Sequence, residues 1–503
     1  MLFNSYIFIF AFLPFTFFIY FYLNSLKLTV AAKAFLVFAS LFFYGWWEIT
    51  YVPIMLSSML FNYVLGISLS KYTQDTKINK KILLSFGIVV NVVLLGYFKY
   101  ADFLIANVNR LLDTHIGLLH LTLPLAISFF TFQQIAYLVD SYRGKTKEYD
   151  FLNYANFVTF FPQLIAGPIV HHSEMMPQFA KTANKVIRYP NIAMGLFIFS
   201  IGLFKKVIIA DTFSVWATAG FDHAPQLHMV EAWVTSLSYT FQLYFDFSGY
   251  TDMAIGLARM FGILLPMNFF SPYKATSIID FWRRWHITLS RFLKECLYIP
   301  LGGSRVGSAR KYSNLVITMS LAGLWHGAGW TFVLWGTLHG LLLAVNHWFR
   351  HHVALLTFLN RMPPYLLRVT IEYSKRTITF ILIIFLWVIF RADSLSAAWT
   401  ILSSMVSFSD TTSYLSLVSD VSAWKHIAVL MFITWFIPNT HEIMGIAEHC
   451  IITYKSNVTV TGGIIIRYLR WQPNWFWCVC ISICTVASIL NLYSVSEFLY
   501  FNF

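Results

Sequence analysis

Two histidines occupy sequence surroundings in which an imidazole could do acid–base chemistry. The first, His326, lies in Ser320-Leu-Ala-Gly-Leu-Trp-His-Gly-Ala-Gly-Trp330, within a strongly apolar run. Gly323 and Gly327 are four residues apart, a spacing of small residues that lets neighbouring backbone approach closely. A buried histidine that a substrate can reach is suited to general-base catalysis. A hydrogen-bonded core histidine at a crossing of small residues would give the same pattern, and spacing alone favours neither interpretation.

The second histidine, His286, lies in the charged and aromatic segment Asp280-Phe-Trp-Arg-Arg-Trp-His-Ile-Thr-Leu-Ser-Arg-Phe-Leu-Lys294. Helical spacing would bring Arg284 and Arg291 together and place Asp280 within reach of Arg284. It would also place Trp282, His286, Leu289 and Leu293 on one face of the helix. The segment therefore predicts a basic amphipathic helix at the membrane surface. In one interpretation, the arginines anchor this helix and His286 is packed between tryptophans. In the other, the arginines attract an anionic donor substrate, and His286 lines the path of that substrate.

Two further motifs contain residue types that can bind phosphate or metal. Leu301-Gly-Gly-Ser-Arg305 could cradle a phosphate with backbone N–H groups beside a basic side chain. Two glycines after a proline equally predict an ordinary turn. His441-Glu442 resembles the start of a zinc-protease helix, but Gly445 stands where the second histidine must be. The sequence therefore predicts no metal site.

The elements that must position these residues are membrane helices. The sequence is 58% apolar and 11% charged, whereas soluble domains are about 25% charged. The apolar runs are Tyr6–Leu23, Phe35–Trp47, Val52–Leu69, Ile82–Phe98, Ile192–Ile209, Ala232–Phe247, Val316–Val345, Thr377–Phe390, His426–Ile437 and Trp475–Leu492. Since roughly 20 apolar residues cross a bilayer as a helix, we predict an all-α polytopic protein with about 10–12 spans.

Two apolar segments are interrupted in a way that differs from a plain span. They are Leu121–Val139 and Phe157–Val170, and the second contains Pro162, Gly167 and Pro168. Broken backbone at membrane depth is tolerated only where protein or a water-filled cavity satisfies its polar groups. We therefore expect both segments to be re-entrant pieces that line a pocket.

Charge predicts the orientation of these spans. The first run lacks the charged leader and small-residue cleavage site of a signal peptide, so it should remain as a transmembrane helix. Lysines follow the first and third runs, namely Lys27, Lys33, Lys71, Lys77, Lys80 and Lys81. The positive-inside rule places these loops in the cytoplasm and the N-terminus outside. The net charge of +13 fits such loops and anionic lipid rather than nucleic acid. Without repeats or long linkers, residues 1–503 are expected to form a single membrane domain.

Seven sequence blocks follow one another over most of the chain. They are Phe160-Phe-Pro-Gln-Leu-Ile-Ala-Gly-Pro168, Tyr244-Phe-Asp-Phe-Ser-Gly-Tyr-Thr-Asp-Met-Ala254, Asn268-Phe-Phe-Ser-Pro-Tyr273, Phe281-Trp-Arg-Arg-Trp-His-Ile-Thr-Leu-Ser290, Tyr298-Ile-Pro-Leu-Gly-Gly303, Gly323-Leu-Trp-His-Gly-Ala-Gly-Trp330 and Phe498-Leu-Tyr-Phe-Asn-Phe503. Together they resemble the membrane-bound O-acyltransferase (MBOAT) family and, within it, the alginate O-acetyltransferase (AlgI-like) branch. This match is far more specific than any one short motif.

The resemblance implies a helical membrane enzyme around a central funnel or tunnel, with a cytoplasmic thioester donor. It implies that His326 is a catalytic residue and that His286 is either catalytic or positions the donor. The donor would bind near Arg283, Arg284, Arg291 and Trp325. Acetyl-CoA would be the donor substrate, and no bound cofactor or metal is expected.

The resemblance also implies a biological role. Acetyl groups would cross the bacterial inner membrane for O-acetylation of an extracytoplasmic polysaccharide, with alginate as the first expectation and peptidoglycan or another glycan as the alternative. A periplasmic O-acetyltransferase partner would receive the acetyl group, since this chain has no obvious soluble acceptor domain. Two interpretations from other classes stay open. One is a transporter or export channel whose broken helices line a permeation path, and the other is a scaffold for a polysaccharide synthase.

Overall fold

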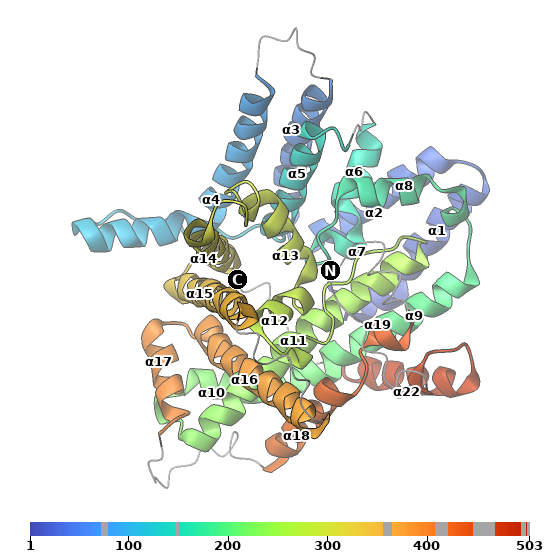
Figure 1. Ribbon diagram of the computed structural model, residues 1–503. Coiled ribbons are helices and arrows are strands. Elements are labelled where there is room, and N and C mark those ends of the chain that lie inside the picture. The colour runs from blue at the N-terminus through green and yellow to red at the C-terminus, as the bar shows by residue number, and fades with distance from the viewer. Residues whose placement is uncertain are drawn as a thin grey trace. The chain divides into compact units, whose positions relative to one another are not determined.

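A computed structural model of the protein describes residues 1–71, 79–146, 150–355, 365–407, 421–445, 468–493 and 499. Within these ranges every regular element is a helix, as Figure 1 shows, and the predicted all-α class is confirmed. Lys77 and the terminal block Phe498–Phe503, apart from Leu499, lie outside the described residues.

The membrane-spanning potential of these helices follows the hydropathy of the sequence. Six helical stretches in the described ranges are long and apolar enough to cross a membrane: Phe8–Ser25, Tyr51–Ser70, Lys80–Leu112, Tyr189–Asp222, Trp330–Arg350 and Val369–Arg391. Three shorter apolar helices are Thr29–Gly45, Val421–Phe436 and Trp475–Leu490. The predicted run Ala232–Phe247 lies in α11 (Met229–Met260), which is helical but outside both groups. Its Ser, Thr and Gln side chains lower its hydropathy.

The chain divides into two compact units, each built from separate stretches of sequence. Unit 1 comprises Met1–Phe204, Gly249–Pro266 and Cys478–Asn502. Unit 2 comprises Lys205–Ser248 and Met267–Trp477. Two long helical segments, Tyr189–Asp222 and Met229–Met260, contribute to both units.

Unit 1 contains the N-terminal helices. These are α1 (Leu13–Ser25), preceded by the π-helix η1 (Phe8–Phe12), α2 (Thr29–Gly45), α3 (Tyr51–Ser70), α4 (Lys80–Leu112), α5 (Ile127–Tyr142), α6 (Phe151–Thr159), α7 (Phe161–Leu164), α8 (His172–Ala180) and α9 (Tyr189–Phe204). Most of α22 (Trp475–Leu490) also belongs to it.

Buried amides join α3, α4 and α5 inside unit 1. Asn62 and Asn91 exchange side-chain hydrogen bonds of 3.1 and 2.7 Å, and Ser58 donates to Gln134 at 3.0 Å. Hydrogen bonds of this kind hold membrane helices together, because the hydrophobic effect does not drive apolar side chains together in lipid. Both interrupted segments lie here: Leu121–Val139 enters α5 after an irregular stretch, and Phe157–Val170 runs from α6 through α7 in a fully buried course.

Unit 2 contains the elements that carry both predicted catalytic histidines. After the π-helix η3 (Lys205–Ala210) come α10 (Asp211–Asp222), the first part of α11, α12 (Ile278–Arg284), α13 (Ile287–Leu293), the π-helix η6 (Lys294–Tyr298), α14 (Ser308–His326), α15 (Trp330–Leu355), α16 (Tyr365–Arg391), α17 (Leu395–Ser404), α18 (Val421–Phe436) and α19 (Thr440–Ile443).

A buried ion cluster stabilises the start of unit 2. Lys206, which is 3% exposed, lies 2.8 Å from a carboxylate oxygen of Asp211 and 2.8 Å from one of Asp246. The lysine and Asp211 flank the junction of η3 and α10, and Asp246 comes from α11. A buried cation needs such partners, because the cost of desolvating an unpaired charge is several kcal/mol.

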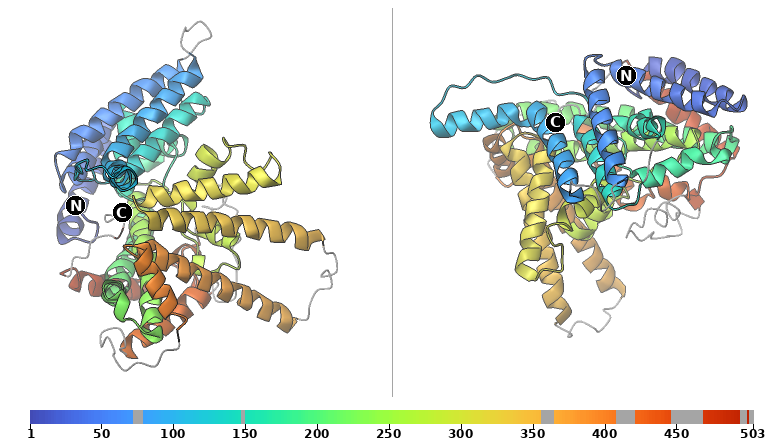
Figure 2. Two further views of the ribbon diagram at one scale, coloured as in Figure 1. Left: turned by 90° about the vertical axis from the view of Figure 1, so that its left-hand side faces the viewer. Right: turned by 90° about the horizontal axis from the view of Figure 1, so that it is seen from above.

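The predicted single run Val316–Val345 is two helices, and the sequence interpretation was wrong here. Gly327 adopts extended backbone (φ −158°, ψ 150°), so α14 ends at His326 and the chain turns back into α15. The two helices lie side by side, as the yellow ribbons of Figure 2 show. Their backbones approach so closely that a Cβ on Gly323 would collide with the carbonyl of Phe332. The glycines therefore permit both the break and the close packing.

Candidate active site

His326 is the last residue of α14 and is buried among aromatic rings. It is 4% exposed. The centroid of its ring lies 4.9 Å from that of Trp325, and 5.3 Å from those of Trp335 on α15 and Phe390 on α16. The histidine thus lies where three helices of unit 2 meet.

His286 occupies a turn, and the predicted continuous helix over Asp280–Lys294 is wrong. The chain forms α12, then breaks at Trp285 and His286 before α13 begins. The break arises because His286 has left-handed backbone (φ 44°, ψ 54°), a conformation that residues other than glycine rarely adopt. Strained backbone of this kind persists only where neighbouring groups fix it.

Asn268 is the residue that fixes this turn. Its backbone carbonyl accepts from the N–H of Ile287 at 2.9 Å. Its side-chain oxygen accepts from the N–H and the hydroxyl of Thr288, at 3.2 and 2.9 Å, and lies 3.0 Å from Nδ1 of His286. One fully buried asparagine therefore holds both the backbone and the ring of His286.

These contacts determine the tautomer of His286. A backbone N–H can only donate, so the Asn268 atom that faces Thr288 must be the carbonyl oxygen. The same oxygen faces Nδ1 of His286, which must therefore carry a proton. The neutral ring then has its lone pair on Nε2, the nitrogen that can accept a proton. Complete burial lowers the pKa of His286 from its ordinary value of 6.5 to about 3, so the imidazole is neutral at physiological pH.

Histidine and tryptophan rings alternate from one predicted catalytic residue to the other and beyond. The His286 and Trp325 centroids are 6.3 Å apart, and Trp325 also contacts His326. On the other side of His326, Trp335 contacts His339 at 4.8 Å. We call His286, Trp325, His326, Trp335 and His339 the ring row. It brings together three of the six predicted site residues.

The three predicted donor-binding arginines have different surroundings. Arg284 forms the expected ion pair with Asp280, at 3.0 Å, and also approaches the carbonyl of Phe270 at 3.4 Å. Arg283 is exposed at the end of α12. Arg291 is half-buried in the last turn of α13. The contacts of Arg284 are those of a residue that stabilises the turn region.

Arg283 belongs to a basic group at the ends of three helices. The charges of Arg283, Lys311 and Arg350 all act on His347 of α15. Lys311 lies in the first turn of α14, and Arg350 lies near the end of α15. We call Arg283, Lys311 and Arg350 the basic cluster. Such a concentration of like charge attracts anions.

Sequence reasoning missed the roles of Asn268 and Trp335. Asn268 stood in a recognised block, but no spacing rule links it to His286, eighteen positions away. Trp335 and His339 are one helical turn apart, which is the only signal that they share a face of α15. The glycine motif Leu301–Arg305 forms a turn in which Gly302 and Gly303 have positive φ values of 108° and 58°. Glycine is the residue that adopts these values without strain.

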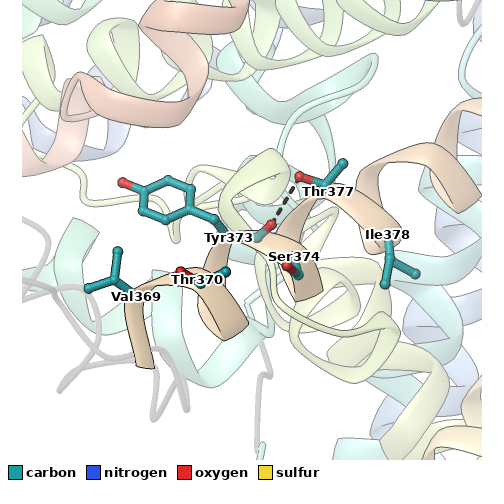
Figure 3. Close-up of a pocket in the computed structure, with 6 residues that line it drawn as sticks. All are labelled: Val369, Thr370, Tyr373, Ser374, Thr377 and Ile378. Atoms are coloured by element: carbon teal, nitrogen blue, oxygen red, sulfur yellow. Dashed lines mark hydrogen bonds between the residues drawn. The ribbon is translucent and has the colours of Figure 1, made fainter. Parts of the chain in front are cut away.

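The open pocket in Figure 3 lies elsewhere, along α16. Its volume is about 590 Å³, and it is lined by Val369, Thr370, Tyr373, Ser374, Thr377 and Ile378. The Thr377 hydroxyl donates to the carbonyl of Tyr373 at 3.0 Å, as the dashed line in Figure 3 shows. None of the six predicted site residues lines this pocket. Across the described part of the chain, no group of three or more His, Cys, Asp or Glu side chains could hold a metal ion.

The fold and the ring row define a helical membrane protein with a group of buried histidines packed among tryptophans. A family model described as MBOAT, membrane-bound O-acyltransferase family, matches residues 141–385. The peptidoglycan O-acetyltransferase of Helicobacter pylori is 46% identical over 540 aligned residues, covering 100% of this chain and 98% of that protein. The probable alginate O-acetylase AlgI of Pseudomonas aeruginosa is 40% identical, covering 81% and 75%, and that of Pseudomonas putida is 37% identical, covering both chains completely. The chain belongs to the membrane-bound O-acyltransferase family and is an acyltransferase.

Proposed function

We propose that this protein moves acetyl groups from a cytoplasmic thioester, acetyl-CoA, across the bacterial inner membrane for O-acetylation of an extracytoplasmic polysaccharide. The observation that carries the proposal is the ring row, in which Trp325 joins His286 and His326. The names of the relatives, a peptidoglycan O-acetyltransferase and two probable alginate O-acetylases, support acetyl as the acyl group and a glycan as the final acceptor.

The chemistry requires one base and one leaving group. His326 accepts the proton of the acceptor hydroxyl, and the hydroxyl oxygen bonds to the thioester carbonyl carbon. The carbon–sulfur bond then breaks, and the departing thiolate takes the proton from His326. His286 accepts a proton at Nε2 or positions the donor, in the orientation that Asn268 fixes.

The basic cluster is the entry point for the donor in this proposal. Phosphate groups of acetyl-CoA are anionic and would bind Arg283, Lys311 and Arg350. From His347, beside this cluster, to Trp335, beside His326, α15 rises by about 18 Å. That length is comparable with an extended pantetheine arm. The thioester would thus reach the ring row while the phosphates stay at the surface.

Two glycans are candidates for the final acceptor. Sequence analysis favoured alginate. The relative named as a peptidoglycan O-acetyltransferase is 46% identical and matches the whole chain, which makes peptidoglycan the first acceptor to test. In either case the acetyl group must be handed on outside the membrane, and a periplasmic O-acetyltransferase partner is the proposed recipient.

The test is transfer of labelled acetyl from acetyl-CoA in membranes that contain the protein, its partner and either glycan. His326→Ala should abolish transfer at equal expression. His352→Ala is the matched control, because His352 is an exposed histidine at the end of α15. Full transfer by His326→Ala would overturn the assignment. Passage of a solute without acetyl transfer would favour the transporter. Loss of acetylation by His326→Ala while the complex still assembles would count against the scaffold.

A further inference from the structure

Two N–H groups on α15 lack an acceptor among the residues that the structure describes. They are the indole N–H of Trp335 and Nε2 of His339, and both side chains are 0% exposed. The two residues are one helical turn apart, and their ring centroids are 4.8 Å apart. Buried donors nearly always have partners, because leaving one unpaired costs about 1–3 kcal/mol. Two such donors on rings in contact therefore point to an acceptor other than the residues that the structure describes.

The proton of His339 is on Nε2 for a structural reason. The indole N–H of Trp282 donates to Nδ1 of His339 over 3.1 Å. An indole nitrogen can only donate, so Nδ1 must be the unprotonated nitrogen of the neutral ring. The hydrogen bond from α12 thus turns His339 into a donor at Nε2.

The position of this donor pair relates it to the reaction. The ring centroids of Trp335 and His326 are 5.3 Å apart, so the side chain that carries one donor packs against the proposed base. The rest of the surroundings are aromatic: Phe281, Trp282 and Trp387 all contact His339. In such an apolar setting, hydrogen bonds to a developing negative charge are stronger than in water.

We propose that Trp335 and His339 donate hydrogen bonds to the carbonyl oxygen of the acyl thioester. This inference rests on the proposed function. When the acceptor oxygen bonds to the carbonyl carbon, the carbonyl electron pair moves onto the oxygen, and the two N–H groups stabilise that charge. When the carbon–sulfur bond breaks, the pair returns to re-form the carbonyl, and the thiolate leaves with the proton held by His326.

Two variants remove the donors with little change in shape. Trp335→Phe keeps an aromatic ring but removes the N–H, and we expect transfer to fall about 100-fold, with little change in KM for acetyl-CoA. His339→Phe should cause a similar loss. His339→Gln keeps an acceptor for Trp282 and an N–H donor, so it should recover much of the activity. Trp387→Phe is the matched control, since Trp387 stacks on Trp335 at 5.7 Å but has no role in the proposal.

A spectroscopic measurement separates hydrogen bonding from packing. Acetyl-CoA labelled with ¹³C at the carbonyl is bound to the inactive His326→Ala variant, and its carbonyl stretch is recorded by infrared spectroscopy. The stretch should move to lower wavenumber on binding, and adding Trp335→Phe should reverse part of that shift. If binding does not change the wavenumber of the carbonyl stretch in either protein, the donor pair is wrong.

The kinetic outcomes distinguish this inference from the proposed function. If His326→Ala abolishes transfer while Trp335→Phe and His339→Phe retain it fully, the donor pair is wrong and the proposed function stands. If Trp387→Phe loses as much activity as Trp335→Phe, packing explains the loss and the donor pair is also wrong. If the intact protein with its partner transfers no acetyl from acetyl-CoA, both proposals fail.

Discussion

Asn268 and His286 are joined by a 3.0 Å contact between Oδ1 and Nδ1, and this contact assigns the proton of a buried imidazole. The same oxygen accepts from Thr288, which fixes the orientation of the amide. The pair therefore couples the strained turn of His286 to the chemistry available at Nε2. Substitutions of Asn268 should therefore alter the reaction although the imidazole of His286 is chemically unchanged.

The first prediction concerns the charge of this contact. Asn268→Asp keeps the accepting oxygen, so the turn should fold, but the new carboxylate favours the protonated form of His286. The pKa of His286 should rise, and the acidic limb of the pH–rate profile should move to higher pH. Asn268→Ala, which removes the acceptor, should instead unfold the turn and cost about 1–3 kcal/mol. A pH–rate profile of Asn268→Asp that matches the unsubstituted protein would contradict a role for this contact in the reaction.

The second prediction concerns stability in acid. Burial lowers the pKa of His286 in the folded protein to about 3, below the 6.5 of an exposed histidine. Below pH 6.5 the unfolded chain therefore binds a proton that the folded chain does not, so stability falls as the pH falls towards 3. At pH 5 this loss amounts to about 2 kcal/mol. Thermal unfolding in detergent between pH 7 and pH 4 should show a steeper decline for the unsubstituted protein than for His286→Gln, and parallel curves would refute the shift.

The third prediction concerns the buried ion cluster. Lys206→Met leaves the carboxylates of Asp211 and Asp246 buried without their cation, and breaking a buried pair in this way typically costs about 3–5 kcal/mol. Adding Asp211→Asn to Lys206→Met should restore part of the loss. Lys205→Met is the control, because half-buried Lys205 is the adjacent lysine and donates to the neutral Thr440 hydroxyl at 2.9 Å. Equal losses in thermal stability from the two lysine variants would count against the cluster.

The fourth prediction concerns the contact between α14 and α15. A Cβ on Gly336 would collide with the backbone carbonyl of Met319, so Gly336→Ala must push the helices apart. We expect a loss of about 1–3 kcal/mol and reduced transfer, since His326 would move relative to Trp335. Gly96→Ala is the matched control, because a Cβ at this helical glycine meets no atom within 4 Å. Unfolding temperatures and transfer rates of the two variants test this directly.

The fifth prediction concerns the basic cluster. Arg283→Gln and Arg350→Gln should raise the KM for acetyl-CoA about 3–10-fold each and weaken its dependence on salt, because both remove a cation from an exposed phosphate site. kcat should change little. Arg305→Gln is the control, since Arg305 is exposed on a neighbouring loop. A fall in kcat without a change in KM would assign these arginines to another role.

Local spacing in the sequence predicted the local features of the fold. The i,i+4 pair of Asp280 and Arg284 forms as expected, and the long apolar runs are helices. These features depend on residues within a few positions of one another. They could therefore be read without knowledge of the tertiary structure.

The breaks in the helices could not be predicted in the same way. His286 leaves the helical conformation because Asn268, which is distant in sequence, satisfies the turn. Gly327 ends α14 because the chain must fold back so that α15 can pack on Gly323. Each break depends on a partner from another element, and periodicity carries no information about such partners. The ring row depends on both breaks, so it could not be predicted from the sequence either.

The interruption at Gly327 also gives the reaction centre an electrical polarity. In a continuous helix, His326 would lie in the middle, far from both the positive and the negative end of the helix dipole. Instead, the carbonyl end of α14 lies at His326, and the amide end of α15 begins at Trp330. A helix C-terminus stabilises a cation and an N-terminus stabilises an anion, each by about 0.3–1 kcal/mol. One short stretch of glycine and alanine thus supplies a negative pole for the imidazolium that forms when His326 takes up a proton.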